Sequence, residues 1–181
     1  MIKLTEYPNI NTSEIEIAGK RYYYDNSLYN SGQTLAWSIR NNEPDTIKLI
    51  ERVFDLCEQV FKVGMVYFVS PNFIFIQDKN SGLDFKIFFT NKKITKIRVV
   101  RFLTLQTETN DELLSQEYDK QRSSSQDMNR FPVAIENDVN LKFDDSYLIE
   151  NLTYGHIKPM IKAINSIKLD WPAETNFYSV K

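Results

Sequence analysis

The clearest pattern in the chain is a stretch near 45–62 in which apolar residues recur every three or four positions. Its apolar members are Ile47, Ile50, Val53, Phe54, Cys57, Val60 and Phe61. This spacing places them on one face of a helix, with charged residues mostly opposite. Pro44 stands where the first helical turn tolerates proline, and Gly64 is a natural residue for ending a helix. The pattern predicts an amphipathic helix over 45–62, with Cys57 in the core.

After Gly64 the apolar residues follow the two-residue period of β-strands. Runs rich in β-branched and aromatic residues occupy 65–70, 73–77, 83–90 and 94–105. The short segments between these runs contain Pro, Asn, Gly and Lys, which favour turns and antiparallel pairing of successive strands. We therefore expect a four-stranded antiparallel meander over 65–105, covered by the helix at 45–62.

Two β-hairpins are predicted outside this meander. Residues 14–17 alternate Glu and Ile, and Gly19 separates them from the aromatic stretch 21–24. This is the pattern of two strands joined by a tight turn. A second hairpin is expected over 133–143, with Glu136-Asn137-Asp138 as its turn, because such residues are common in turns.

Further helices are expected on both sides of the meander. A short helix is predicted at 34–40, and another runs from Asn110, whose side chain can cap it, to 118. A second amphipathic helix is predicted over 158–168, with Pro159 in its first turn. The polar segment 107–130 carries few apolar residues, and we expect it to be mobile.

These elements predict an α+β fold, in which a mostly antiparallel sheet packs against amphipathic helices near 45–62 and 158–168. The chain has 181 residues, 42% hydrophobic and 25% charged, which is enough for a single domain over 1–181. One Cys and one His exclude a disulfide framework and metal sites rich in either residue. No apolar run approaches the roughly 18 residues of a membrane span, and no secretory signal is recognised. We therefore expect a cytoplasmic protein.

Carboxylates gather between 136 and 150, and they supply the candidates for catalysis. Asp144, Asp145 and Glu150 precede His156, which is able to act as a general base oriented by a neighbouring carboxylate. Clustered carboxylates also hold Mg²⁺ or Mn²⁺ in nucleases and phosphodiesterases. The same residue types are common in turns and helix caps, so the structural interpretation stays open. Neither a glycine-rich phosphate loop nor a nucleophile motif accompanies them.

Positive charge is concentrated in the meander. The segment 84–101 holds six bases and one acid. Alternation places Lys86 and Phe88 on the outer face of the sheet, with Lys96 and Arg98 beside them on the next strand. Cations and an aromatic ring on one sheet face are typical of proteins that bind RNA or single-stranded DNA. The alternative is the solvated outer face of a half-buried antiparallel sheet.

Negative charge is concentrated in the segment that follows. Residues 108–150 include eleven acids and four bases. Asp111, Glu112, Glu117 and Asp119 are candidates for a surface that imitates nucleic-acid phosphates and occupies a basic groove of another protein. The alternatives are plain solubility, or an internal complement to the basic strands.

The stretches PNINTSE, YYYDNSLYN and QDKNSG are typical of AT-rich Gram-positive bacteria and their phages. In this composition, and in its small acidic character, the chain resembles phage-encoded anti-CRISPR proteins that block Cas9. The resemblance implies a small inhibitor that binds a large protein or ribonucleoprotein effector, such as Cas9 with its guide RNA. It includes no motif, so no site residue is carried over from the family.

Two functions are therefore carried forward from the sequence. The first is a non-enzymatic binding module without a cofactor, which a surplus of tyrosines favours because tyrosine is common at interfaces. Its partner is the effector, with RNA as a further ligand. The alternative is a metal-assisted nuclease or phosphodiesterase that uses the carboxylates of 136–150 and His156. The oligomeric state stays open.

Overall fold

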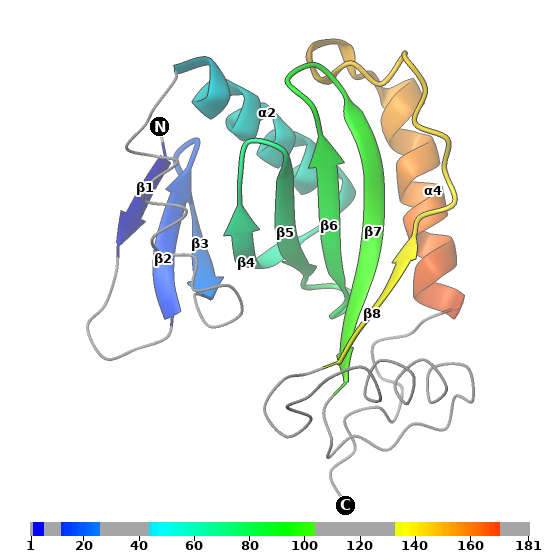
Figure 1. The fold of residues 1–181 in the computed structure, drawn as a ribbon, viewed down its shortest axis with the longest axis horizontal. Helices are drawn as coiled ribbons and strands as arrows, with labels where there is room; N and C mark the ends of the chain where they lie inside the picture. The colour runs from blue at the N-terminus through cyan, green and yellow to red at the C-terminus, as the bar shows by residue number, and fades with distance from the viewer. Residues whose placement is uncertain (1, 6–11, 26–43, 104–132, 171–181) are drawn as a thin grey trace, which may run out of the picture.

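The computed structural model describes residues 2–5, 12–25, 44–103 and 133–170, which form one eight-stranded β-sheet and its helices (Figure 1). The strands are β1 (Ile2–Thr5), β2 (Thr12–Ile17), β3 (Lys20–Asp25), β4 (Val63–Val69), β5 (Phe73–Asp78), β6 (Asp84–Phe89), β7 (Ile94–Leu103) and β8 (Val133–Asp138). The helices are α2 (Pro44–Val60), α4 (Tyr154–Asp170) and the 3-10 helix η1 (Ile149–Asn151). The predicted α+β fold is confirmed, as are the meander and the helix at 45–62. No helix in these residues is long and apolar enough to cross a membrane.

The strands follow one another across the sheet in the order in which they occur along the chain. All neighbours are antiparallel except β3 and β4, which run parallel. α2 lies between β3 and β4 in the chain, and parallel neighbours require such a crossover. The parallel register includes only Tyr23 with Met65 and Tyr24 with Val66. The strands β1–β3 therefore join the rest of the sheet through a short contact.

The hairpin of β2 and β3 turns at Ala18 and Gly19. Their φ angles are 51° and 80°, in the left-handed region that glycine adopts without strain. A two-residue turn with both central residues in this region matches the twist of the strands that it joins. Pairing starts at Ile17 and Lys20 on either side of the turn. The hairpin predicted over 14–24 is confirmed.

α2 and α4 pack on one face of the sheet, which we call the inner face (Figure 1). Buried inner-face side chains include Ile15, Tyr24, Val66, Ile76, Phe85, Ile87 and Ile97. Phe54 of α2 and Met160 of α4 are buried against this layer. Cys57 is 1% exposed, and burial raises the pKa of its thiol. Cys57 is thus a neutral core residue, as its place on the helix predicts.

Gly64 does not end the helix, contrary to the prediction. α2 ends at Val60, and Gly64 lies within β4, where the register with β5 shifts between Val63 and Met65. The extra residue forms a β-bulge. A Cβ atom at Gly64 would lie 3.1 Å from the Cβ of Lys79, so the close approach of the chain after β5 favours glycine here.

The second predicted helix is confirmed, but it begins earlier than expected. α4 starts at Tyr154, so Pro159 lies inside the helix and past its first turn. The helices predicted at 34–40 and 110–118, and the polar segment 107–130, lie outside the described residues.

The hairpin predicted over 133–143 is wrong. β8 runs through 136–138 and pairs with β7, with Asp138 opposite Arg98, and residues 139–143 form no strand. Glu136 and Asp138 alternate along β8 and face cations of the neighbouring strands. Pairing between opposite charges therefore outweighs the turn preference of these residue types.

Candidate functional site

The face of the sheet opposite α2 and α4, which we call the outer face, carries the basic residues singled out from the sequence. Alternate side chains of β6 and β7 are buried in the inner core, namely Phe85, Ile87, Phe89, Ile97 and Val99. Lys86, Lys96 and Arg98 occupy the intervening positions, and so does Phe88. The structure therefore places all three predicted cations and Phe88 on the outer face.

Two aromatic rings and a lysine form a half-buried group on this face. The rings of Phe73 and Phe88 stack, with centroids 5.5 Å apart and an angle of 25° between the planes. The Nζ of Lys96 lies 4.6 Å from the centroid of Phe88, and the guanidinium carbon of Arg98 lies 5.7 Å from it. Both distances are typical of cation–π contacts. We call Phe73, Phe88 and Lys96 the aromatic patch.

The aromatic patch adjoins a packed apolar layer on the same face of the sheet. Tyr67, Phe75 and Val100 form a second buried cluster, and Phe73 packs against it. The rings of Tyr67 and Phe75 lie 4.8 Å apart, and the Nζ of Lys86 lies 5.5 Å from the Phe75 centroid. The patch is therefore held by the strands that carry it and by packed side chains beside it.

Carboxylates of β8 neutralise two of the three cations. Glu136 pairs with both Lys86 and Arg98, and its Oε2 lies 2.8 Å from the Nη1 of Arg98. The Nε of Arg98 donates a hydrogen bond of 2.7 Å to the Oδ1 of Asp138. Among the described residues Lys96 forms no ion pair. Sequence reasoning assigned Glu136 and Asp138 to a turn, although their spacing of two residues is also the signature of one strand face.

The pKa shifts follow from this pairing. Burial raises the pKa of Glu136, but hydrogen bonds and charge from Lys86 and Arg98 outweigh it, and the net pKa is lowered. The hydrogen bond to Asp138, and then that to Glu136, raises the pKa of Arg98. The Glu136 carboxylate and the Arg98 guanidinium therefore stabilise each other in their charged forms, and their pairing reduces the net charge of the outer face.

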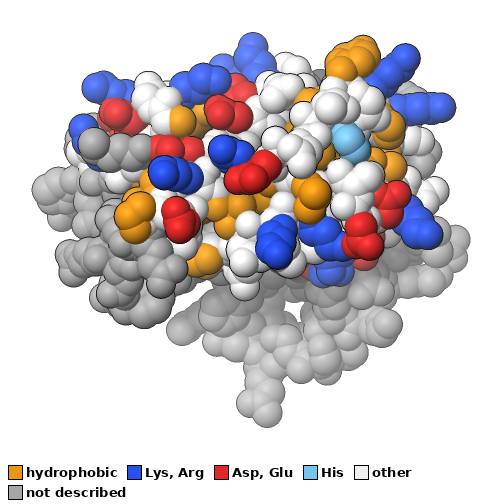
Figure 2. Space-filling view, turned by 90° about the horizontal axis from the view of Figure 1, so that it is seen from above, with side chains coloured by type: hydrophobic (Ala, Val, Ile, Leu, Met, Phe, Trp, Pro, Cys, Tyr) orange, Lys and Arg blue, Asp and Glu red, His pale blue; other side chains and the backbone are white. Residues whose placement is uncertain are grey.

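The structure does not bring the predicted catalytic carboxylates together. The Oδ1 of Asp144 accepts hydrogen bonds from the backbone N–H of Ser146 at 2.9 Å and from its hydroxyl at 2.6 Å. Asp145 pairs with Lys93 at 2.7 Å, and Glu150 is paired with a cation of α2. These three carboxylates serve separate structural contacts. Acidic and basic side chains are also interspersed over the end of the molecule seen in Figure 2.

His156 has a structural role at the start of α4. Its Nδ1 accepts a hydrogen bond of 3.1 Å from the backbone N–H of Thr153, and the Thr153 hydroxyl lies 3.0 Å from the same atom. The ring of Tyr147 meets the imidazole edge-on, with centroids 5.2 Å apart. Thr153 precedes the helix and His156 is its third residue, so the bond from the Thr153 N–H to the imidazole reproduces one half of a capping box, with histidine in the usual place of glutamate.

The remaining predicted residues supply no metal site and no acidic surface among the described residues. No group of three or more His, Cys, Asp or Glu side chains suited to a metal ion occurs in the part of the chain that the structure describes. The acidic candidates Asp111, Glu112, Glu117 and Asp119 lie outside that part.

The structure thus brings together the predicted residues Lys86, Phe88, Lys96 and Arg98, and it adds Phe73, which the sequence pattern did not single out. Comparison with known proteins gives no match to this chain, whether among family models, curated sequences or solved structures.

Proposed function

We propose that this protein is a non-enzymatic binding module that contacts a large effector protein through the outer face of its sheet. The observation that carries the proposal is the aromatic patch, in which Phe73, Phe88 and Lys96 are partly exposed on rigid strands. Aromatic side chains held in place supply contact area at little cost in entropy, and they dominate binding energy at interfaces.

The charge of this face favours a protein surface over nucleic-acid phosphates. Binding to phosphates depends on Lys and Arg that are free to replace counterions. Lys86 and Arg98 already have carboxylate partners on β8. Aromatic residues and arginine are enriched at the centres of protein interfaces, where unpaired charge is scarce. We therefore place the direct contact on protein, with any RNA held by the effector.

The resemblance to anti-CRISPR proteins supplies the class of effector. The proposed partner is a large nucleic-acid-handling protein such as Cas9 with its guide RNA, and the proposed effect is inhibition. The metal-assisted nuclease is not taken further, because Asp144, Asp145 and His156 each bond to a different neighbour.

An affinity pull-down from a bacterial lysate, with and without ribonuclease treatment, tests this function. We expect the tagged protein to retain a large effector in both samples, and Phe88→Ala to reduce retention about tenfold because it removes a stacked ring. Lys96→Glu gives a second variant that leaves the packed layer intact. Lys92→Glu is the matched control, since Lys92 is exposed in the turn between β6 and β7.

Phe88→Ala and Lys96→Glu together show whether the effector contacts the aromatic patch. Equal retention by the wild type, Phe88→Ala and Lys96→Glu would contradict the assignment of the contact to this face. Loss of all retention after ribonuclease treatment would contradict direct contact with protein. Melting temperatures of the purified variants show whether a reduced signal reflects unfolding.

A further inference from the structure

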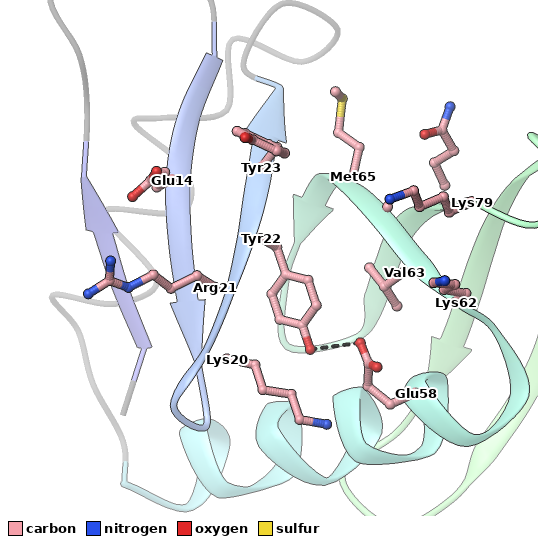
Figure 3. Close-up of a pocket in the computed structure, with 12 residues that line it drawn as sticks. Glu14, Lys20, Arg21, Tyr22, Tyr23, Glu58, Lys62, Val63, Met65 and Lys79 are labelled. Atoms are coloured by element: carbon pink, nitrogen blue, oxygen red, sulfur yellow. Dashed lines mark hydrogen bonds between the residues drawn. The ribbon is translucent and has the colours of Figure 1, made fainter.

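A cleft with a volume of about 780 Å³ lies between β3 and β4 (Figure 3). It lies beside the residues that precede the parallel pairing of β3 with β4. The first pair is Tyr23 with Met65, so the preceding residues of β3 and β4 are not paired with one another. The β-bulge at Gly64 lies at the same level of β4, and Gly64 also lines the cleft. The volume falls in the range of about 300–1,000 Å³ that is usual for ligand sites.

Tyr22 and Glu58 form the inner end of the cleft, against α2. The Tyr22 hydroxyl donates a hydrogen bond of 2.8 Å to the Oε1 of Glu58, as the dashed line in Figure 3 marks. The Tyr22 ring is 8% exposed and packs on Phe54, with centroids 5.5 Å apart. Burial, and then the bond to Glu58, raises the pKa of Tyr22. The phenol therefore stays neutral and fixes the position of the Glu58 carboxylate.

Positive charge exceeds negative charge around the cleft. The charged residues that line it are Lys20, Arg21, Lys62, Lys79, Glu14 and Glu58. Arg21 is partly offset by Glu16, at 3.7 Å. The three lysines make no ion pair with any described residue. Lys20 reaches in from the start of β3, whereas Lys62 and Lys79 come from the opposite wall (Figure 3). An anion in the cleft would meet ammonium groups from both sides.

An apolar surface completes the mouth of the cleft. The Tyr23 side chain is 61% exposed, which is unusual for a large aromatic residue in the described part of this chain. Met65 lies opposite Tyr23 in the register, and both residues line the cleft. An exposed aromatic face stacks on planar rings, and a thioether packs readily beside one.

We propose that this cleft binds a nucleotide, with its phosphates between the lysines and its base against Tyr23 and Met65. Lysines without an ion-pair partner among the described residues, combined with an exposed aromatic ring, distinguish this ligand class from a simple inorganic anion. The site goes beyond the binding function proposed above and shares no residue with the aromatic patch. Failure of one proposal is therefore distinguishable from failure of the other.

Titration calorimetry of the full chain with ADP is the first test. We expect measurable binding that weakens as salt is added, because the lysines are exposed. The double substitution Lys62→Met and Lys79→Met should raise the Kd about tenfold by removing two charge-assisted contacts. Lys92→Met, at the exposed turn between β6 and β7, is the control and should leave the Kd unchanged.

Removal of the negative charge at the inner end of the cleft should strengthen ADP binding. Glu58→Gln removes a negative charge but keeps an oxygen that accepts the Tyr22 hydrogen bond. We expect this variant to bind ADP about threefold more tightly. Tyr23→Ser should weaken the binding of ADP and leave the binding of pyrophosphate unchanged, because only the adenine base contacts the Tyr23 ring.

Three outcomes overturn the proposal. The first is the absence of ADP binding at millimolar concentration. The second is an unchanged Kd for ADP in the double lysine variant together with a Kd that is unchanged or higher in Glu58→Gln. The third is a Kd for pyrophosphate as low as the Kd for ADP. The last outcome would assign the cleft to inorganic anions and refute the nucleotide. Substitutions at exposed lysines leave the core intact, and melting temperatures verify that each variant folds.

Discussion

The imidazole of His156 accepts a hydrogen bond from the backbone N–H of Thr153, and this bond gives His156 a structural role at the start of α4. A ring nitrogen that accepts an N–H from the residue before a helix satisfies a donor that the helix itself leaves unpaired. The one histidine of the chain thereby serves the start of α4. The sequence shows the helix start but not the direction in which the ring turns, because a histidine there is equally compatible with a catalytic base.

His156→Ala should lower the free energy of unfolding by about 1 kcal/mol, since it removes one half of a capping box. His156→Glu should retain the stability of the wild type at neutral pH, because the carboxylate accepts the same N–H and suits a helix N-terminus. Urea denaturation measures both. Equal destabilisation by the two substitutions would contradict the capping role, and Lys158→Ala on the exposed side of α4 is the control.

Asp78 connects two turns at one end of the sheet. It is fully buried, its Oδ1 accepts the backbone N–H of Lys62 at 3.0 Å, and its Oδ2 accepts both the N–H and the hydroxyl of Ser81. Asp78→Ala should cost about 2 kcal/mol because it leaves two partly buried backbone donors without partners. Ser81→Ala should cost about 1 kcal/mol.

Denaturation of both single variants and of the double variant measures this connection. The double variant should be less destabilised than the sum of the single variants, because the two residues share a hydrogen bond. Additive effects would contradict the role of the pair.

At the scale of elements, the attachment of β8 to the sheet depends on charge. Glu136 has a lowered pKa in the folded protein, so its contribution to stability is present above the ordinary carboxyl value of 4.5 and is lost as the pH falls through the lower folded value. Glu136→Gln should therefore lower the melting temperature at neutral pH, and the difference from the wild type should disappear in acid.

Melting curves of both proteins from pH 7 down to about pH 2 follow this difference. Glu150→Gln is the matched control, because Glu150 is 76% exposed and pairs at 3.3 Å, so it should change the melting temperature little. A difference in melting temperature between wild type and Glu136→Gln that stays constant over the pH range would contradict the role of the Glu136 charge in holding β8.

The same elements show how far the sequence predicts the structure. Local periodicity suffices for α2 and for the strands between Val63 and Leu103, because each apolar run has its partner a few residues away. The alternation of β6 and β7 also predicts which side chains point outward. The course of β8 is not predictable in this way, because the conformation of Glu136 depends on cations that lie far away in sequence. The cleft is likewise not predictable from local periodicity, because residues far apart in the sequence line it, such as Tyr22, Glu58 and Lys79.

At the scale of the whole molecule, the sheet has a weak joint. β1–β3 pair with β4 through a register of only two residue pairs, although their buried side chains join the common core, where Tyr22 contacts α2. We expect amide hydrogens in β1–β3 to exchange with solvent faster than those in β5–β7, because β3 pairs with β4 at only two positions, whereas β5–β7 pair with one another along most of their length. Hydrogen exchange measured by mass spectrometry resolves the two regions. Uniform protection from β1 to β7 would contradict a joint at this position.

The order of the strands has a consequence for how the chain folds. Every strand lies beside the one made just before it, so most contacts in the sheet join segments that are near in sequence. Chains with such local contacts lose little entropy when each loop closes, and they fold quickly for their size. Successive strands are thus able to assemble during synthesis, each on an edge that already exists. β4 and β8 are the costly steps, because residues 26–62 must be made before β4 pairs with β3, and residues 104–132 must be made before β8 pairs with β7.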